Sequence, residues 1–475
     1  MKHNLKQINE YCFEIPKQGK MRVPARLFGD KELIEELEPK VFEQVANVAT
    51  LPGIVKASYA MPDAHWGYGF PIGGVAAFDP DKGGIISVGG IGYDISCGVR
   101  TLITNLSKEE VESKLNLIAT TLFKRIPAGV GSEGFIKLSE SKLDEVLLKG
   151  AHWAVEQGYG SKEDLEFIED GGMIKGAMPD KVSSTAKKRQ KKQVGTLGSG
   201  NHYLEIQYVS KIYDEKTAKI YGLKKGQVVV TIHCGSRALG HQIGTDYIHI
   251  LMKAAEKYGI YLPERELVCA PIYSKEGQDF YGAMVCGINC ALANRQVLTH
   301  LVRECFFEVF PGATLTLLYD VSHNTCKIEV HKINGQSKKL FVHRKGATRA
   351  YPPGSFEIPE KYREVGQPVI IGGTMGTASY ILAGNKGQQD PAFYSACHGA
   401  GRSISRRQAT KKWKGKDIIK SLAQQGIIIM AASKKGAAEE APMAYKDVDK
   451  VVNSTHEAGL ARRVVKLRPM CCIKG

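Results

Sequence analysis

The 475-residue chain lacks the features that would mark a membrane or secreted protein. It has no run of about 18 consecutive apolar residues, so the sequence predicts no membrane-spanning helix. Its first residues lead into no apolar signal core, and we therefore expect a cytoplasmic protein. No two of its 11 cysteines form a C-x-x-C pair, which argues against a zinc ribbon. An odd number of irregularly spaced cysteines indicates reduced and mostly buried thiols instead.

Two common nucleotide-binding signatures are missing as well. The chain lacks the Gly-Lys-Ser/Thr ending of a P-loop, and its G-x-G-x-x-G run at 129–134 follows an expected helix instead of a strand, so it is no dinucleotide fingerprint. It also has no internal repeat, coiled-coil heptad or low-complexity linker that would divide it. We therefore predict one catalytic domain over residues 1–475, with a mostly helical peripheral region at about 107–192.

Acidic residues are scarce relative to basic ones. Lysine and arginine total 65 against 49 acidic residues, which gives a net charge of 65 − 49 = +16. An excess of this size favours a polyanionic partner such as a nucleic acid, and a basic protein without such a partner is the alternative. The run 187–192 carries five positive charges in six residues. It is either a solvated helix face or a phosphate-backbone contact, and its position before a histidine-bearing loop favours the contact.

The hydrophobic pattern predicts a mixed α/β (α+β) fold, with a β-sheet core and surrounding helices. Apolar runs at 228–232 and 314–318 are typical of buried strands, and each leads to a histidine. Helical spacing predicts one helix over about 39–49 and a long apolar helix over 283–309. A further helix is expected to begin at a capping box, residues 107–110, and to continue as one stripe through 122.

Candidate metal ligands lie in glycine-rich turns. Asp94 and Cys97 are three residues apart on a loop that is flanked by glycines, and glycines allow a ligand to approach the backbone closely. Neither residue can fill a coordination sphere alone, so we expect His202, His233 and His323 to join them. One such histidine would more often be a hydrogen-bonded core residue, but the whole set makes that interpretation unattractive.

Five donors are many for one open catalytic metal, and they suit two metals that share a bridging thiolate. Mixed oxygen, nitrogen and sulfur donors accommodate Mn²⁺, Zn²⁺, Fe²⁺ or Co²⁺. A further histidine, His398, is either a sixth ligand or a nucleophile. Its neighbours favour the nucleophile, because residues 399–401 are small and Arg402 can hold a phosphate. A neutral imidazole nitrogen can attack phosphorus.

Three further loops are candidate walls of the site. The glycine-rich segment 61–74 carries Asp63, which we expect to contact the reactive side chains without touching the substrate itself. A rigid turn capped by Asp63 is the alternative. The basic loop 341–350 is predicted to reach anionic oxygens. The Gly/Ser/Thr-rich loop 370–379 suits backbone N–H contacts with phosphate.

Six motifs together resemble a known family. In chain order they are Asp94-Ile95-Ser96-Cys97-Gly98, Gly198-Ser199-Gly200-Asn201-His202, His233-Cys234-Gly235-Ser236-Arg237, Ser322-His323-Asn324, His343-Arg344-Lys345-Gly346-Ala347-Thr348-Arg349-Ala350 and His398-Gly399-Ala400-Gly401-Arg402. Each is weak alone, but six in this order closely resemble the RtcB family of GTP-dependent RNA ligases, from about residue 60 to the C-terminus. The departures are mild: Cys234, Ala238 and Thr374 stand where Ser or Thr, Gly and Ser, respectively, are commoner.

The resemblance implies a single catalytic domain that joins RNA ending in a 3′-phosphate or 2′,3′-cyclic phosphate to 5′-hydroxyl RNA, in tRNA splicing or RNA repair. It implies GTP and two Mn²⁺ ions as cofactors, with GMP carried first by a histidine and then by the RNA 3′-phosphate as RNA-3′-pp-5′-G. The implied partners are tRNA halves or cleaved RNA, and an activating protein such as archease.

The resemblance also implies a role for each matching residue. His398 would carry GMP; Asp94, Cys97 and His202 would hold one metal, and Cys97, His233 and His323 the other. The guanylate would be bound by Asn201, Glu205, Asn324, Thr374, Ser379, Gly401 and Lys474. RNA phosphates would meet Arg237, Arg344, Lys345, Arg349 and Arg402.

Two other functions compete with this interpretation. In a di-metal phosphoesterase the metals would hydrolyse a phosphate ester and His398 would only donate a proton. In a basic RNA-binding protein with structural metal there would be no turnover at all. Transfer of label from GTP to His398 separates the ligase from both.

Overall fold

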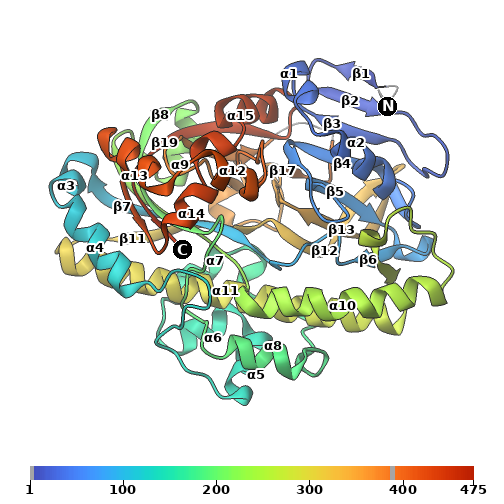
Figure 1. Ribbon diagram of the computed structural model, residues 1–475, viewed down its shortest axis with the longest axis horizontal. Coiled ribbons are helices and arrows are strands. Elements are labelled where there is room, and N and C mark those ends of the chain that lie inside the picture. The colour runs from blue at the N-terminus through green and yellow to red at the C-terminus, as the bar shows by residue number, and fades with distance from the viewer. Residues whose placement is uncertain (1–4, 386–390) are drawn as a thin grey trace.

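Two large mixed β-sheets form the core of the computed structural model, which describes residues 5–385 and 391–475 (Figure 1). In strand order, the first sheet consists of β1 (Lys6–Asn9), β2 (Cys12–Ile15), β3 (Ala25–Phe28), β4 (Ile54–His65), β5 (Ile72–Phe78), β13 (Gln336–Lys345) and β12 (Asn324–Ile333). All its neighbouring strands are antiparallel except β3 and β4.

The second sheet contains the strands predicted to lead to histidines. Its order is β11 (Leu315–Ser322), β7 (Gly98–Ser107), β9 (Gln227–Cys234), β8 (Tyr203–Ile212), β19 (Ala461–Lys474), β16 (Ser379–Gly384) and β15 (Pro368–Ile371), with β18 (Ile428–Ala431) parallel to β19. Two short pairs complete the strands: β6 (Ile85–Ser87) with β10 (Cys269–Pro271), and β14 (Ala347–Arg349) with β17 (Ser395–Cys397).

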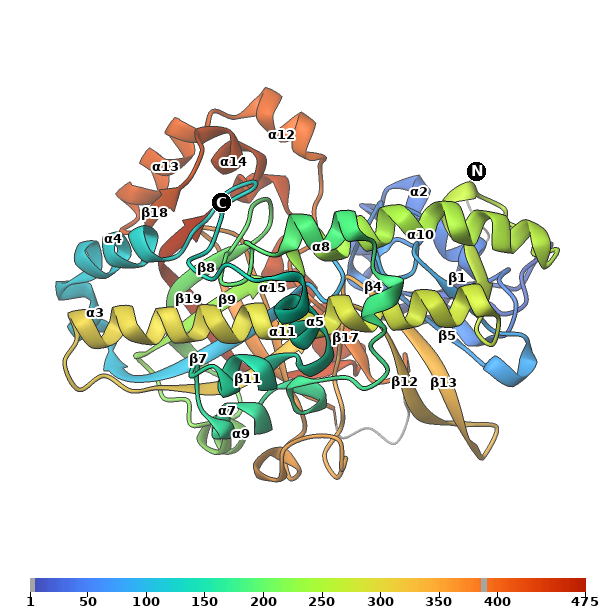
Figure 2. The same cartoon turned by 90° about the horizontal axis from the view of Figure 1, so that it is seen from below.

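Two long helices pack side by side along one side of both sheets, α10 (Arg237–Lys257) and α11 (Lys275–Val309) (Figures 1 and 2). The apolar helix predicted over 283–309 is confirmed, and α11 begins eight residues earlier. Nearly every side chain from 282 to 302 is buried, including Cys286 and Cys290. A helix that is apolar around its circumference must be covered on all sides, and α11 is the central element of the largest hydrophobic core.

Between β7 and β8 the chain forms helices and loops. The helices are α3 (Lys108–Ser113), α4 (Leu115–Arg125), α5 (Glu140–Lys149), α6 (Ala151–Glu156), α7 (Lys162–Glu166) and α8 (Ser184–Gln190). The predicted capping box is confirmed: Ser107 and Glu110 exchange side-chain and backbone hydrogen bonds. The prediction of one continuous helix through 122 is wrong, because Lys114 leaves helical geometry at φ −123° and ψ 20° and separates α3 from α4.

The remaining helices lie near the two ends of the chain, except α9, which is in its middle. They are α1 (Lys31–Glu35), α2 (Pro39–Val48), α9 (Glu215–Tyr221), α12 (Arg406–Lys412), α13 (Gly415–Gln424), α14 (Lys434–Glu439) and α15 (Val448–Glu457). Figure 2 shows α12, α13 and α14 gathered into a projection from the body. The mixed α/β class is confirmed by these elements. Within the described ranges, no helix has both the length and the apolarity needed to cross a bilayer.

Candidate active site

Strand order brings three of the predicted metal ligands to one end of the second sheet. β7 lies between β11 and β9 and is antiparallel to both. Gly98, the first residue of β7, is opposite Ser322 on one side and Cys234 on the other. Residues next to paired positions lie at the same end of a sheet, so Cys97, His233 and His323 converge although the chain separates them widely.

The donor atoms of all five predicted ligands are close together. The Sγ of Cys97 lies 3.3 Å from Nε2 of His202 and 3.1 Å from Nε2 of His233. His202 Nε2 lies 2.7 Å from the Asp94 carboxylate, and the Nε2 atoms of His233 and His323 are 3.2 Å apart. They form two groups that share Cys97, with all ligand atoms of each group within 4.8 Å: Asp94, Cys97 and His202, and Cys97, His233 and His323.

The electrostatics of the groups suit metal ligation. Burial keeps the pKa values of His233 and His323 well below the usual imidazole value, and each ring also lies near other histidines. These rings are therefore neutral and offer a lone pair. Burial and the Asp94 carboxylate raise the pKa of the Cys97 thiol well above its ordinary value, so a divalent cation is the natural partner for a thiolate there. One carboxylate, one sulfur and three imidazoles fit a transition-metal dication.

His398 lies beside the second group of ligands and is supported by Asp63. It directly follows β17, and its ring centroid is 4.7 Å from that of His323. Its Nδ1 lies 2.7 Å from Oδ2 of Asp63, a fully buried residue of β4. The same oxygen accepts the backbone N–H groups of His398 at 3.1 Å and Gly399 at 3.3 Å. Asp63 thus fixes both the ring and the turn that carries it.

These groups open into a pocket of about 490 Å³ where the ends of the two sheets meet. Of the residues expected to bind guanylate, six line this pocket: Asn201, Glu205, Asn324, Thr374, Gly401 and Lys474. Ser379 does not line it. Its Oγ accepts the Gly373 N–H at 3.0 Å and the Gln207 side-chain amide at 2.9 Å, and Gln207 also donates to Glu205. Ser379 therefore reaches the pocket only through these neighbours.

Glu205 and Lys474 provide the ionisable groups on the wall formed by β8 and β19. Burial raises the pKa of the Glu205 carboxyl to about 7, although Cys472, Lys474 and Gln207 oppose the shift. Lys474 is 5% exposed and its Nζ donates to the Gly200 carbonyl at 3.1 Å. Strand pairing of β19 with β8 holds this lysine in place, so it is ordered although it is the penultimate residue of the chain.

The five residues expected to contact RNA fall into two groups. Lys345 and Arg402 line the pocket, and burial lowers the pKa of the Lys345 ammonium to about 7. Arg237 does not line the pocket, and its Nε donates to Thr196 Oγ1 at 3.1 Å. Arg344 and Arg349 are buried and ion-paired. Neither of them lines the pocket.

Three carboxylates pair with these two arginines, and two of them, Glu329 and Glu169, are buried. Glu329 forms both contacts of a bidentate pair with Arg344, at 2.6 and 2.9 Å. Asp170 and Glu169 accept from Arg349 at 2.9 and 3.3 Å. Because such pairing depends on residues far away in the sequence, the basic composition of the loop 341–350 did not reveal it.

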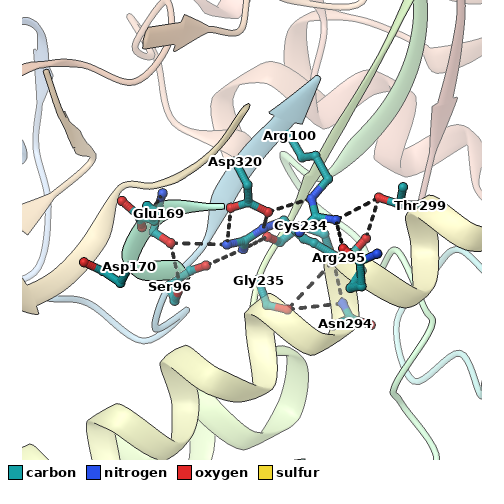
Figure 3. Close-up of polar contacts among 12 residues, drawn as sticks. Ser96, Arg100, Glu169, Asp170, Cys234, Gly235, Asn294, Arg295, Thr299 and Asp320 are labelled. Carbon is teal, nitrogen blue, oxygen red and sulfur yellow. Dashed lines mark hydrogen bonds and ion pairs between the residues drawn. The ribbon is translucent and has the colours of Figure 1, made fainter. Parts of the chain in front are cut away.

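Sequence reasoning also missed a buried arginine behind the metal ligands. Arg295 of α11 is fully buried and forms a bidentate pair with Asp320, in which its Nε and Nη2 each lie 2.8 Å from a carboxylate oxygen (Figure 3). Its Nη1 donates to the carbonyls of Ser96 at 2.7 Å and Cys234 at 2.9 Å, and its Nη2 donates to Ser322 Oγ at 3.2 Å.

Each of these three acceptors is the chain neighbour of one ligand in the second group. A single guanidinium therefore connects the segments that carry Cys97, His233 and His323. The signal that could have revealed Arg295 is the polar run Asn294-Arg295-Gln296 in the middle of an apolar helix, since charged residues are fully buried only when they are paired.

Comparison with known proteins gives the family. A family model described as tRNA-splicing ligase RtcB matches residues 44–475. The chain belongs to the RtcB family. The tRNA-splicing ligase RtcB of Thermococcus kodakarensis is 54% identical over 477 residues, which cover 99% of each chain. The protein of the same name from Archaeoglobus fulgidus is 50% identical with the same coverage.

A bacterial relative extends the match beyond the archaea. The RNA-splicing ligase RtcB of Mycobacterium tuberculosis is 53% identical over 434 residues, which cover 91% of this chain and all of its own. The resemblance carried by the six motifs is thus confirmed at the level of the RtcB family.

Proposed function

We propose that this protein is an RNA ligase that joins a 3′-phosphate or 2′,3′-cyclic phosphate end to a 5′-hydroxyl end, with GTP as the energy source. One observation supports this proposal above all others. A buried carboxylate, Asp63, holds the Nδ1 side of His398, whose ring lies against a ligand of the second metal group in a nucleotide-sized pocket. The names of the relatives, tRNA-splicing and RNA-splicing ligases, support the same activity.

In the first step, Nε2 of His398 attacks the α-phosphorus of GTP. Oδ2 of Asp63 lies 2.7 Å from Nδ1, and with the proton on that nitrogen the lone pair lies on Nε2. The N–P bond forms, the bond from the α-phosphorus to the bridging oxygen breaks, and pyrophosphate leaves. The positive charge that develops on the ring is stabilised by the Asp63 carboxylate, so no proton has to leave Nδ1 during the attack.

Two transfers complete the ligation. An oxygen of the RNA 3′-phosphate attacks the phosphorus on His398 and gives RNA-3′-pp-5′-G with return of the free imidazole. The 5′-hydroxyl of the second RNA then attacks the 3′-phosphate, forms the phosphodiester and releases GMP. A cyclic end is first opened by water to the 3′-phosphate.

The two ligand groups fit two Mn²⁺ ions with Cys97 as the shared ligand. Such dications neutralise phosphate charge and polarise the reacting groups. The neutral rings of His233 and His323 keep lone pairs available for this purpose. Glu205 and Lys474 would bind the guanine and the ribose side of the nucleotide. Arg402 and Lys345, which also line the pocket, would hold its phosphates.

We place the activity in tRNA splicing or RNA repair in the cytoplasm, with tRNA halves or cleaved RNA as substrates and archease as an activating partner. Relatives that are 54% and 50% identical to this chain are tRNA-splicing ligases by name, which supports the first of these roles. The excess of basic residues supports a nucleic acid substrate.

The proposal is tested by incubating the protein with a labelled 3′-phosphate RNA, a 5′-hydroxyl RNA and GTP, with each divalent ion in turn. The expected result is a GTP-dependent product of joined length that resists phosphatase, strongest with Mn²⁺. A pair with 3′-hydroxyl and 5′-phosphate ends is the control and should not be joined. Loss of the 3′-phosphate without joining would instead indicate the di-metal phosphoesterase.

A further inference from the structure

The positive charge of the chain is concentrated in one short stretch. Residues 402–435 contain ten lysines and arginines and a single acidic residue, Asp417, a net charge of 10 − 1 = +9 out of +16 for the whole chain. This stretch forms α12, α13 and the beginning of α14, the group of helices that projects from the body in Figure 2. The charge therefore occupies one place on the molecule.

Most of these cations are free to bind a partner. We call seven of them the basic rim: Arg407, Lys411, Lys412, Lys414, Lys416, Lys420 and Lys434. All seven are exposed. In the part of the chain that the structure describes, none of the seven takes part in an ion pair within 4.0 Å. A cluster of exposed like charges without counter-ions is unfavourable in isolation, and a polyanion removes the repulsion.

The basic rim begins where the pocket ends. Residues 402–406 line the pocket, and within them Arg402 and the partly exposed Arg406 pair with the buried Glu440 at 3.4 and 3.0 Å. From Arg407 onward the cations face outward. A chain that leaves the pocket on this side meets the exposed side chains next.

A shared hydrophobic cluster fixes the rim relative to the pocket. Ile418 and Leu422 of α13 are buried in a cluster with Met375 and Tyr203, and the latter two line the pocket. The large exposed apolar side chains of the molecule lie outside residues 402–435, so the surface offers charge without an apolar patch. Such a surface suits phosphate contacts that do not depend on base sequence.

The basic run predicted to contact phosphate, 187–192, is a weaker candidate. Lys187 is buried and lies 2.8 Å from Asp144. Lys192 pairs with Glu133 at 3.0 Å, and Arg189 donates to Gln242 at 2.6 Å. Half of that run is already occupied by partners within the protein, whereas the basic rim is not.

We propose that the basic rim binds the phosphodiester backbone of the substrate RNA outside the pocket, so that affinity comes from α12–α14 and chemistry from the metal centre. This proposal rests on the proposed ligase function. It predicts that the benefit of the rim grows with RNA length, because nucleotides next to the reacting ends lie in the pocket and only more distant ones reach the helices.

The test compares two quadruple variants of the full-length protein. The first, Lys411→Ser/Lys412→Ser/Lys416→Ser/Lys420→Ser, removes four charges from the rim. The matched control, Lys224→Ser/Lys225→Ser/Lys332→Ser/Lys339→Ser, removes four exposed lysines that are also without ion pairs among the described residues and do not line the pocket. Fluorescence anisotropy measures binding of a 3′-phosphate RNA without GTP over a series of salt concentrations.

We expect the rim variant to bind a long RNA about tenfold or more weakly, and its salt dependence to be flatter by roughly 0.7 in slope for each lost phosphate contact. A very short RNA should lose little affinity, and the control variant should bind like wild type. Equal weakening of both variants, or wild-type binding by the rim variant, would overturn the proposal.

GTP labelling of each variant is the fold control, because it needs no RNA. Loss of labelling in the rim variant alone would show that α12–α14 supports the pocket instead of binding RNA, and would also overturn the proposal. If wild-type protein neither labels nor ligates, the proposed function fails, whatever the anisotropy shows. The two failures are therefore distinguishable.

Discussion

Nδ1 of His398 lies 2.7 Å from Oδ2 of Asp63, although 335 residues separate them along the chain. We expect this contact to determine which imidazole nitrogen is available for chemistry. A carboxylate beside a protonated Nδ1 leaves the lone pair on Nε2 and compensates the charge that the ring would acquire when Nε2 attacks phosphorus. We therefore propose that Asp63 is a positioning residue for His398.

Replacing Asp63 by asparagine should slow transfer of GMP to His398 while leaving the fold intact. An amide of the same size can donate to Nδ1 and favour the wrong tautomer, and positioned proton-holding groups typically contribute roughly 10²- to 10⁴-fold in rate. The rate of labelling by GTP measures the effect, and thermal unfolding monitors stability. A variant that labels within about twofold of wild type would show that Asp63 does not control the tautomer.

Cys97→Ser should reduce the content of bound metal below two ions per chain, because both ligand groups share this sulfur. Metal analysis after dialysis against Mn²⁺ measures the effect. Cys234→Ser is the matched control: Cys234 is also buried and lies beside a ligand, but its Sγ is directed at backbone carbonyls and Asn294. Equal metal content in the two variants would contradict a shared thiolate.

Arg295→Lys should weaken metal binding by roughly 10- to 100-fold, the usual cost of losing a group that orients ligands. Lysine retains a charge beside Asp320 but cannot reach the Ser96 and Cys234 carbonyls and Ser322 together. Arg100→Lys is the control, because Arg100 pairs with the same Asp320 at 2.7 Å and, among the described residues, its guanidinium otherwise donates hydrogen bonds to Gln296 and Thr299 alone.

For the Arg295→Lys and Arg100→Lys variants, calorimetric titration with Mn²⁺ measures metal affinity, and thermal unfolding of the metal-free proteins measures stability. A purely structural role for Arg295 would lower the stability of both variants and leave the two metal affinities alike.

GTP affinity should rise with pH through about 7, because burial raises the pKa of Glu205 to that value. Below it the carboxyl is neutral in the folded protein, and above it the carboxylate can accept N–H donors of guanine. The affinity of GTP for the His398→Ala variant, which cannot react, should increase by up to about tenfold for each unit by which the pH rises towards 7. The same protein with Glu205→Gln should bind more weakly and without this pH dependence; an unchanged slope would exclude Glu205.

Local sequence indicated the candidate ligands that the structure brings together, because each lies in a short, chemically unusual turn next to a strand. Glycines around Asp94 and Cys97 and the histidines after 228–232 and 314–318 are visible without any knowledge of pairing. The strand order that brings these turns together cannot be seen in the local sequence, since it depends on β7 lying between β11 and β9.

Local sequence did not show how Arg344 and Arg349 are held. A basic loop gives no sign of the buried carboxylates, Glu329 and Glu169, that pair with its arginines. The break at Lys114 likewise interrupts a regular apolar stripe, so periodicity predicted one helix where the structure has two. Charge compensation across long sequence separations is the part that composition cannot supply.

The central claim is that His398 carries GMP beside a two-metal centre. The most direct measurement is incubation of the protein with α-labelled GTP and Mn²⁺, followed by denaturing electrophoresis and peptide mapping. The account predicts an acid-labile, alkali-stable label on the peptide that contains His398, and its absence from the His398→Ala variant. Wild-type protein that joins RNA ends without ever acquiring such a label, or a label that persists in His398→Ala, would contradict it.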